Sequence, residues 1–339
     1  MRVHPTTLWH TRPAATLRTA HEASNRAHNC DRGASYHPRM EPNIVIRRGA
    51  PGDSRHCHQV LYASITGFEA EHGTPLKGTE EEWWADIEPY FDHLAEDAAE
   101  WWVAEEPETG SLIGFARSTD SGGLFELTEF FVQPGHQGRG IGRELLDRAF
   151  PPDRGSTRAI IATRDVRALA RYYATGMVAR FPILGMSGAT NAADAPGDIA
   201  VSPVDGEADV AAIRSIDRSI LGFERTPATW RCLVENREAY LYRRGNTAIG
   251  FAFVSAGGSG PISALDTADL PGILLHVEDR ARAIGMKRLS LEVPAPNEVA
   301  TRHLLSRGFR FDPFVSFLLS DRPFGQFDRF IGFSPPLFL

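Results

Sequence analysis

The chain has 339 residues, of which 42% are hydrophobic and 23% charged, and a formal net charge of −7. This length favours two domains, and the apolar and charged fractions are ordinary for a globular protein. No apolar run reaches membrane-spanning length, the N-terminus has no signal-peptide core, and no basic stripe follows a predicted element. We therefore expect a cytoplasmic protein that binds neither a membrane nor nucleic acid. Cys30, Cys57 and Cys232 lack metal-ligand spacing and indicate free thiols in a reducing compartment.

Residues 1–42 are rich in arginine and histidine and show no apolar period. We expect them to form a disordered N-terminal extension. The first convincing strand covers 44–47, and further strands are predicted at 101–105 and 112–117. The segment 68–100, between the first two strands, combines many acidic side chains with tryptophans, which is typical of a solvated amphipathic helix.

The most informative segment runs from 129 to 150. An apolar strand ends at Pro134, and Gly138, Gly140 and Gly142 then lead into an amphipathic helix. Glycines at this place leave backbone N–H groups uncovered at a helix N-terminus, where the helix dipole favours an anion. The order of strand, glycine loop and helix therefore predicts a phosphate cradle.

Two familiar phosphate loops do not fit this cradle. A Walker loop needs lysine and a hydroxyl residue after its last glycine, but Arg143 and Glu144 follow Gly142. A dinucleotide fingerprint that starts at Gly140 needs a third glycine where Leu145 stands. Both alternatives are therefore set aside.

The pattern Gln137-Gly-Arg-Gly-Ile-Gly142, preceded by Val132-x-Pro134, resembles motif A of the GNAT superfamily of acyl-CoA-dependent N-acyltransferases. The next family motif is similar to the run from Asp165 through Tyr172 to Gly176, with aspartate in place of the usual asparagine. The resemblance implies an α/β fold (α+β with a mixed central sheet and flanking helices), acetyl-CoA as co-substrate and no metal.

The resemblance also assigns cofactor contacts. Phe131 and Val132 would pair with the pantetheine arm through their backbone, and Asp165 would contact it from the next helix. The pyrophosphate would be held by the residues of the loop and first helical turn, namely Gln137, Gly138, Arg139, Gly140, Ile141, Gly142 and Arg143. Arg139 and Arg143 would add charge to the phosphates or simply form a solvated helix face.

An amine acceptor must lose a proton, and the leaving thiolate must gain one. The resemblance places Tyr172 where the family keeps the proton donor. Glu126 and Glu129 lie on the strand that leads into the cradle and are the candidates for the base. Strand alternation would put them on opposite faces, but this strand commonly bulges in the family, so the choice between them stays open. Another frequent base position of the family is occupied by Ile160.

A small, polar and turn-rich segment at 188–198 predicts a linker. Beyond it the order of the first half is repeated in weaker form, and the run from Asn297 through Leu304 to Gly308 repeats the second motif. No glycine cradle precedes it. We therefore expect tandem GNAT-like domains, with an active copy at 43–187 and a degenerate copy at 199–339, in which Glu292 takes the place of Ile160.

The expected activity is transfer of an acetyl or other short acyl group from acetyl-CoA to a small primary amine, directly and through a ternary complex. In the family, the region at 68–100 shapes the acceptor mouth, so its acidic side chains would favour a cationic amine. Two rival hypotheses are an acyl-CoA sensor without activity and a structural interaction protein. The sequence leaves open the acceptor, the acyl length and whether the protein is a monomer or a homo-oligomer.

Overall fold

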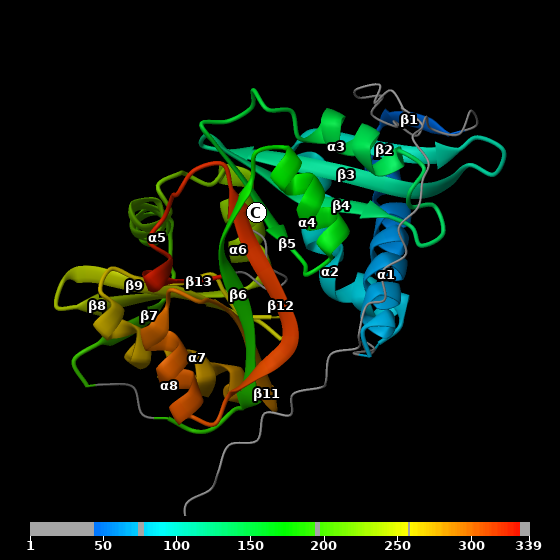
Figure 1. The fold of residues 1–339 in the computed structure, drawn as a ribbon. Helices are drawn as coiled ribbons and strands as arrows, with labels where there is room; N and C mark the ends of the chain where they lie inside the picture. The colour runs from blue at the N-terminus through cyan, green and yellow to red at the C-terminus, as the bar shows by residue number, and fades with distance from the viewer. Residues whose placement is uncertain (1–43, 74–77, 194–196, 257, 333–339) are drawn as a thin grey trace, which may run out of the picture. The chain divides into compact units, whose positions relative to one another are not determined.

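The computed structural model describes residues 44–73, 78–193, 197–256 and 258–332. The predicted disordered extension at 1–42 lies outside these ranges, as does part of the predicted linker. The described residues belong to one folded unit of helices packed on mixed sheets, which confirms the predicted α/β class (Figure 1).

The same order of elements occurs twice along the chain. The first pass consists of β1 (Val45–Arg48), α1 (Ser54–Glu71), α2 (Glu80–Glu96), β2 (Ala98–Glu106), β3 (Ser111–Ser121), β4 (Leu124–Val132), α3 (Ile141–Ala149), β5 (Thr157–Ala162), α4 (Val166–Ala174) and β6 (Val178–Ala189). The second pass consists of β7 (Ala200–Pro203), α5 (Glu207–Leu221), α6 (Pro227–Asn236), β8 (Glu238–Arg244), β9 (Thr247–Val254), β10 (Ile262–Ala264), α7 (Leu270–Ala283), β11 (Arg288–Pro294), α8 (Glu298–Ser306) and β12 (Arg310–Ser320). A short β13 (Phe330–Ile331) follows. The repeated order supports a duplication.

The two passes share a sheet. Eight strands have the order β1-β2-β3-β4-β5-β12-β6-β11, and five more have the order β13-β10-β9-β8-β7. Strand β12 of the second pass lies between β5 and β6 of the first, with Leu318 opposite both Ile161 and Phe181 (Figure 1). The segment predicted as a boundary, 188–198, lies between the two passes along the chain. The eight-stranded sheet nevertheless contains strands of both passes, because β12 pairs with β5 and β6.

Local sequence explains where the two matching helices begin and end. Asp165 caps α4 by accepting a hydrogen bond from Arg167 N at 2.8 Å, and Asn297 caps α8 by accepting from Ala300 N at 3.0 Å. Side-chain oxygens at this position satisfy N–H groups that have no partner inside the helix. Gly176 and Gly308 follow the two helices with φ of 87° and 88°, a conformation that side chains resist.

Strand β4 carries a bulge that positions the site. Its register against β3 shifts between the pairs Arg117↔Glu129 and Ser118↔Leu127, so Thr128 is the extra residue. The Thr128 hydroxyl donates to Arg117 O at 3.0 Å, which fastens the bulge. Because one extra residue reverses the alternation, Glu126 and Glu129 fall on the same face of the sheet.

The bulge also marks where β4 and β5 separate. Their parallel pairing runs from Leu124↔Thr157 to Leu127↔Ile160 and goes no further. Beyond it, Phe130 to Val132 pair with β3 alone. One edge of β4 is therefore open over this stretch.

The two faces of this sheet have separate cores. On one face Leu127 and Ile160 pack with Leu145 of α3 and Tyr172 of α4. On the other face a cluster around Phe115 and Phe91 packs against α1 and α2. A cavity at the point where β4 and β5 separate can therefore connect one face with the other.

Candidate active site

The glycine loop has the conformation of an anion cradle. Gly138 and Gly140 have φ of 83° and 88°, and Gly140 is the residue that caps α3. An added Cβ on Gly142 would lie 3.2 Å from the Phe130 ring. The backbone conformation requires glycine at the first two positions, and close packing on β4 requires it at the third. The loop thus presents bare backbone at the N-terminus of a nine-residue helix.

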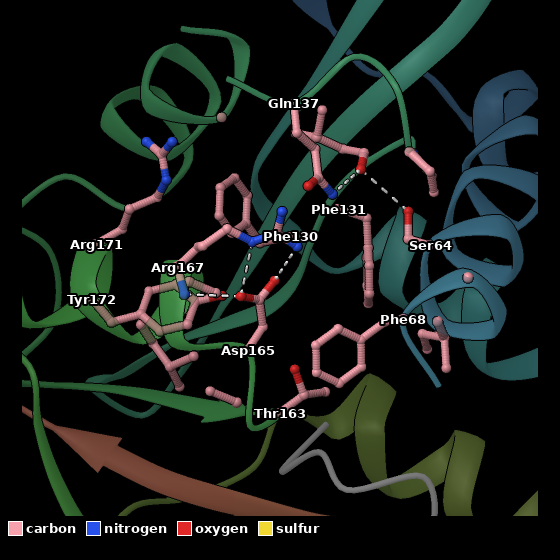
Figure 2. Close-up of a pocket in the computed structure, with 18 of the residues that line it drawn as sticks. Ser64, Phe68, Phe130, Phe131, Gln137, Thr163, Asp165, Arg167, Arg171 and Tyr172 are labelled. Carbon is pink, nitrogen blue, oxygen red and sulfur yellow. Dashed lines mark hydrogen bonds and ion pairs between the residues drawn. The ribbon is translucent and has the colours of Figure 1, made fainter. Parts of the chain in front are cut away.

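A cleft of about 780 Å³ opens beside this loop. Its walls come from α1, β4, the glycine loop, β5, α4 and β12. The cleft includes Phe130 and Tyr172 from the core on one face of the sheet, and Phe131 and Ile65 from the core on the other. It therefore passes through the sheet where β4 and β5 separate, and its two ends have different linings (Figure 2).

Most of the residues predicted to hold the cofactor line this cleft. They are Phe131, Val132, Gln137, Gly138, Gly142 and Asp165. The others, Arg139, Gly140, Ile141 and Arg143, belong to the same loop and the first turn of α3. The Gln137 side chain donates to Val132 O at 3.1 Å, so it holds the loop against the open edge of β4.

Tyr172 lies in the wall of the cleft on α4, and its ring meets that of Phe130 edge-on with centroids 6.1 Å apart. Only 5% of the residue is exposed. Burial, and to a smaller extent the Asp165 carboxylate, raises the pKa of the Tyr172 phenol. Since both effects disfavour the phenolate, the hydroxyl keeps its proton at neutral pH, as a proton donor must.

Asp165 has a local structural role as well as a place in the cleft. Besides capping α4, its carboxylate pairs with the Arg167 guanidinium at 3.3 Å (Figure 2). Arg171 also lines the cleft and forms no hydrogen bond or ion pair with any described residue. The wall formed by α4 therefore offers a guanidinium to an anionic ligand.

The two glutamates of β4 are both buried, and neither borders the cleft. Glu129 accepts a hydrogen bond from Arg117 Nε at 2.5 Å, and Arg117 in turn donates to Phe91 O at 3.2 Å. The pair is enclosed, with side-chain exposures of 0% and 4%. Glu129 therefore has an internal partner beneath the bulge, and Glu126 lies on the same face of the sheet before the bulge.

The cleft also contains residues that the sequence did not single out, namely Ser64 of α1 and Phe314 of β12 from the second pass. Phe68 and Glu69, at the end of α1, also line it and belong to the segment 68–100 that was expected to shape the acceptor mouth. The irregular stretch of β12 between Phe311 and Val315 brings Phe314 there. The acidic side chains of α2 do not border the cleft in the described part of the chain; Glu80, for example, binds Arg55 and His58.

In the second half, the gap that corresponds to the one between β4 and β5 is filled. Strand β13 pairs with β10 through Ile262↔Ile331, and Gly332 N donates to Glu292 O of β11 at 2.9 Å. Asn297, the counterpart of Asp165, donates from its side chain to Phe330 O at 3.1 Å. Backbone of the chain itself therefore lies between β10 and β11, where the first half has its cleft.

Other classes of site were searched for among the described residues. No group of three or more His, Cys, Asp or Glu side chains there is placed to hold a metal ion. No described helix combines the length and apolarity needed to cross a membrane.

The comparisons with known proteins agree with this geometry. Residues 97–175, from just after α2 to just after α4, match the family model for the acetyltransferase (GNAT) domain. The segment contains the glycine loop, both glutamates of β4 and Tyr172. The match covers this segment of the chain, which therefore resembles a GNAT domain in sequence. No curated protein matches the sequence.

Solved structures resemble the chain over most of its length. A putative acetyltransferase from Pyrococcus horikoshii has 14% sequence identity and a TM-score of 0.67, covering 88% of this chain and 97% of its own. A GCN5-related N-acetyltransferase from Sphaerobacter thermophilus has 16% identity and a TM-score of 0.58, with 84% and 98% covered. A tandem GNAT protein from the clavulanic acid biosynthesis pathway has 14% identity and a TM-score of 0.57, with 83% and 99% covered. At such identities the likeness shows the fold alone.

Proposed function

We propose that the chain is an acyl-CoA-dependent N-acetyltransferase that transfers an acetyl or other short acyl group from acetyl-CoA to a small primary amine. One observation carries the proposal: a cleft through the sheet has a glycine cradle at one end and a buried, protonated tyrosine in its wall. A cradle alone would suit many phosphates. The open edge of β4 beside it suits an arm with amide groups, such as pantetheine.

Each part of the cleft has a proposed task. The loop at 137–143 holds the pyrophosphate through backbone N–H groups, with Arg171 as a further positive charge. Phe131 and Val132 align the pantetheine arm along the open edge of β4. The thioester supplies the acyl group, and we assign to Tyr172 the donation of a proton to the leaving sulfur.

The proposed reaction must also account for the protons that the acceptor amine loses. The ammonium of the acceptor first loses a proton, and we assign its uptake to Glu126 through a water molecule. The amine nitrogen then attacks the thioester carbonyl carbon, so that an N–C bond forms and the C–S bond breaks. Tyr172 gives its proton to the sulfur and regains one from the nitrogen. The products are an amide, coenzyme A and one proton released to solvent.

Glu129 is the second candidate for the base, and its carboxylate is held by the enclosed Arg117. We propose cytoplasmic activity, since Cys57 and Cys232 are buried free thiols that suit a reducing compartment. The proposal is tested by mixing the protein with acetyl-CoA and a panel of amines and measuring the acetylated products by mass spectrometry. Tight acetyl-CoA binding without any acetylated amine would reject it.

A further inference from the structure

The end of the cleft away from the glycine cradle contains a buried carboxylate. Glu69, near the end of α1, borders the cleft, and only 2% of the residue is exposed to solvent. It accepts a hydrogen bond from Arg164 Nη2 at 3.0 Å. Glu69 therefore presents a carboxyl group to the cleft, held in place by the Arg164 guanidinium.

Arg164 holds this carboxylate from the loop after β5. Its Nη1 donates to Pro313 O at 3.2 Å, and its guanidinium carbon lies 5.8 Å from the centroid of the Phe68 ring. Arg164 itself does not border the cleft, whereas Glu69 does. The charge that a ligand meets at this end is therefore that of the carboxylate.

Apolar side chains form the walls around Glu69. They are Ile65 and Phe68 of α1, Phe131 of β4, Ile161 of β5 and Phe314 of β12. Figure 2 shows Phe68 and Phe131 facing the same space from α1 and β4. A cationic ligand at this end would meet a carboxyl group together with aromatic faces, which attract cations.

We propose that Glu69 recognises the ammonium group of the acceptor, and that the acceptor is a monocationic primary amine with an apolar or aromatic body. This inference rests on the acyltransferase function proposed above. Phe314 completes the apolar wall, so the second half of the chain takes part in choosing the acceptor. A polyamine would need a second buried carboxylate for its further ammonium groups. The other acidic residue that α1 contributes to the cleft is Glu71, and it is exposed, so polyamines fit less well.

The test measures recognition separately from chemistry. The probe is 2-phenylethylamine, its neutral isostere is 2-phenylethanol, and spermidine represents the polyamines. Glu69→Gln should raise KM for 2-phenylethylamine about 10- to 100-fold and change kcat less than about threefold, in keeping with loss of a charge-assisted contact. Glu71→Gln, the matched control on the same helix, should change KM less than about threefold. Inhibition by 2-phenylethanol should be the same in both variants and the wild type.

A second measurement needs no variant. Calorimetry of the wild type saturated with coenzyme A should show 2-phenylethylamine binding that weakens as the pH rises through the pKa of the amine, near 10 for an alkylamine. Binding that strengthens over this range would mean that the neutral amine is bound, and it would overturn the role of Glu69. The role of Glu69 would also be overturned if Glu69→Gln left KM for 2-phenylethylamine unchanged, or if spermidine were the better acceptor.

The two proposals can fail separately. If coenzyme A binds but no amine is acetylated, the proposed function fails, and the calorimetric pH dependence still tests amine recognition by Glu69. If acetylation occurs and Glu69→Gln binds acetyl-CoA normally with an unchanged KM, only the recognition proposal fails. Phe314→Ala should raise KM for 2-phenylethylamine more than for ethylamine; equal effects on both would contradict the proposed wall.

Discussion

The gap between β4 and β5 in the first half and the gap between β10 and β11 in the second have opposite contents. The first is a cleft beside a glycine cradle, with Tyr172 in its wall. The second contains β13, bound to β10 on one side and bridged to β11 on the other. Asn297, in the place of Asp165, binds the Phe330 carbonyl. A duplicated fold can therefore keep its architecture while its own C-terminal strand closes one of the two sites.

The difference extends to the residues that would perform chemistry. Tyr172 corresponds to Leu304 of the second half, and Ile160 corresponds to Glu292, which is joined to the closing strand through its backbone. The second half instead contributes β12 and Phe314 to the cleft of the first. The second half thus has its own gap filled and supplies part of the wall of the other cleft.

The largest expected effect concerns the matched pair Tyr172 and Leu304. Tyr172→Phe should lower kcat about 10²- to 10⁴-fold, the range for loss of a general acid, while acetyl-CoA binding stays within about twofold. Leu304→Met should leave both unchanged. Thiol release and calorimetry measure the two quantities. Full turnover by Tyr172→Phe would remove tyrosine from the proposed mechanism.

The raised pKa of Tyr172 has a consequence in the wild type. A donor must carry its proton, and burial moves the loss of that proton to a pH above the ordinary value of 10. The kcat of the wild type should therefore not fall between pH 8 and pH 10. A decline in kcat with an apparent pKa below 10 would contradict the assignment of Tyr172 as the donor.

The next effect concerns the bulge that opens the first gap. Glu129→Gln leaves the guanidinium of Arg117 enclosed without its counter-charge, which should lower the free energy of unfolding by about 3–5 kcal/mol. Asp217→Asn, which breaks the enclosed pair with Arg225 in the second half, should cost a similar amount. Denaturant unfolding measures both. If Glu129→Gln were fully stable but inactive, Glu129 would instead be a candidate for the base.

A smaller effect concerns Glu292 in the closed half. Burial, with a smaller contribution from Asp312, raises the pKa of this carboxyl from 4.5 to about 7. The folded state therefore holds the proton more tightly, and the resulting stability is present below pH 4.5 and lost as the pH rises through 7. Glu292→Gln does not titrate, so it should be more stable than the wild type by about 1–3 kcal/mol at pH 8. Thermal unfolding at pH 5 and pH 8 measures this gain; equal gains at both would exclude titration as its cause.

The smallest expected effect compares a glycine of the cradle with a glycine of an ordinary turn. Gly138 and Gly308 both have positive φ and open space around an added Cβ. Alanine at either position should lower the free energy of unfolding by about 1–2 kcal/mol, the usual cost of this conformation. Only Gly138→Ala should also weaken acetyl-CoA binding, about 3- to 10-fold. Equal affinities in the two variants would show that the loop does not hold the ligand.

Local signals in the sequence predicted the elements around the site. The glycine loop and the order of the second half depend on short-range chemistry, and the structure contains both of them. The insertion of β12 beside β5 could not be predicted, because alternation along a strand does not specify its neighbour. The bulge was expected only from the family, and the contribution of Phe314 follows from the unexpected pairing. Ser64 and Ile65 of α1 were not singled out, because an ordinary amphipathic helix gives no sign of which residues face a cleft.

The central claim is that the chain binds acyl-CoA in the first half and nowhere else. Calorimetry with acetyl-CoA on the wild type and on Gly142→Val tests it directly, because a side chain at 142 meets the Phe130 ring behind the cradle. We predict one molecule per chain for the wild type and no measurable binding for a folded Gly142→Val variant. Two molecules per chain, or undiminished binding by the variant, would contradict it.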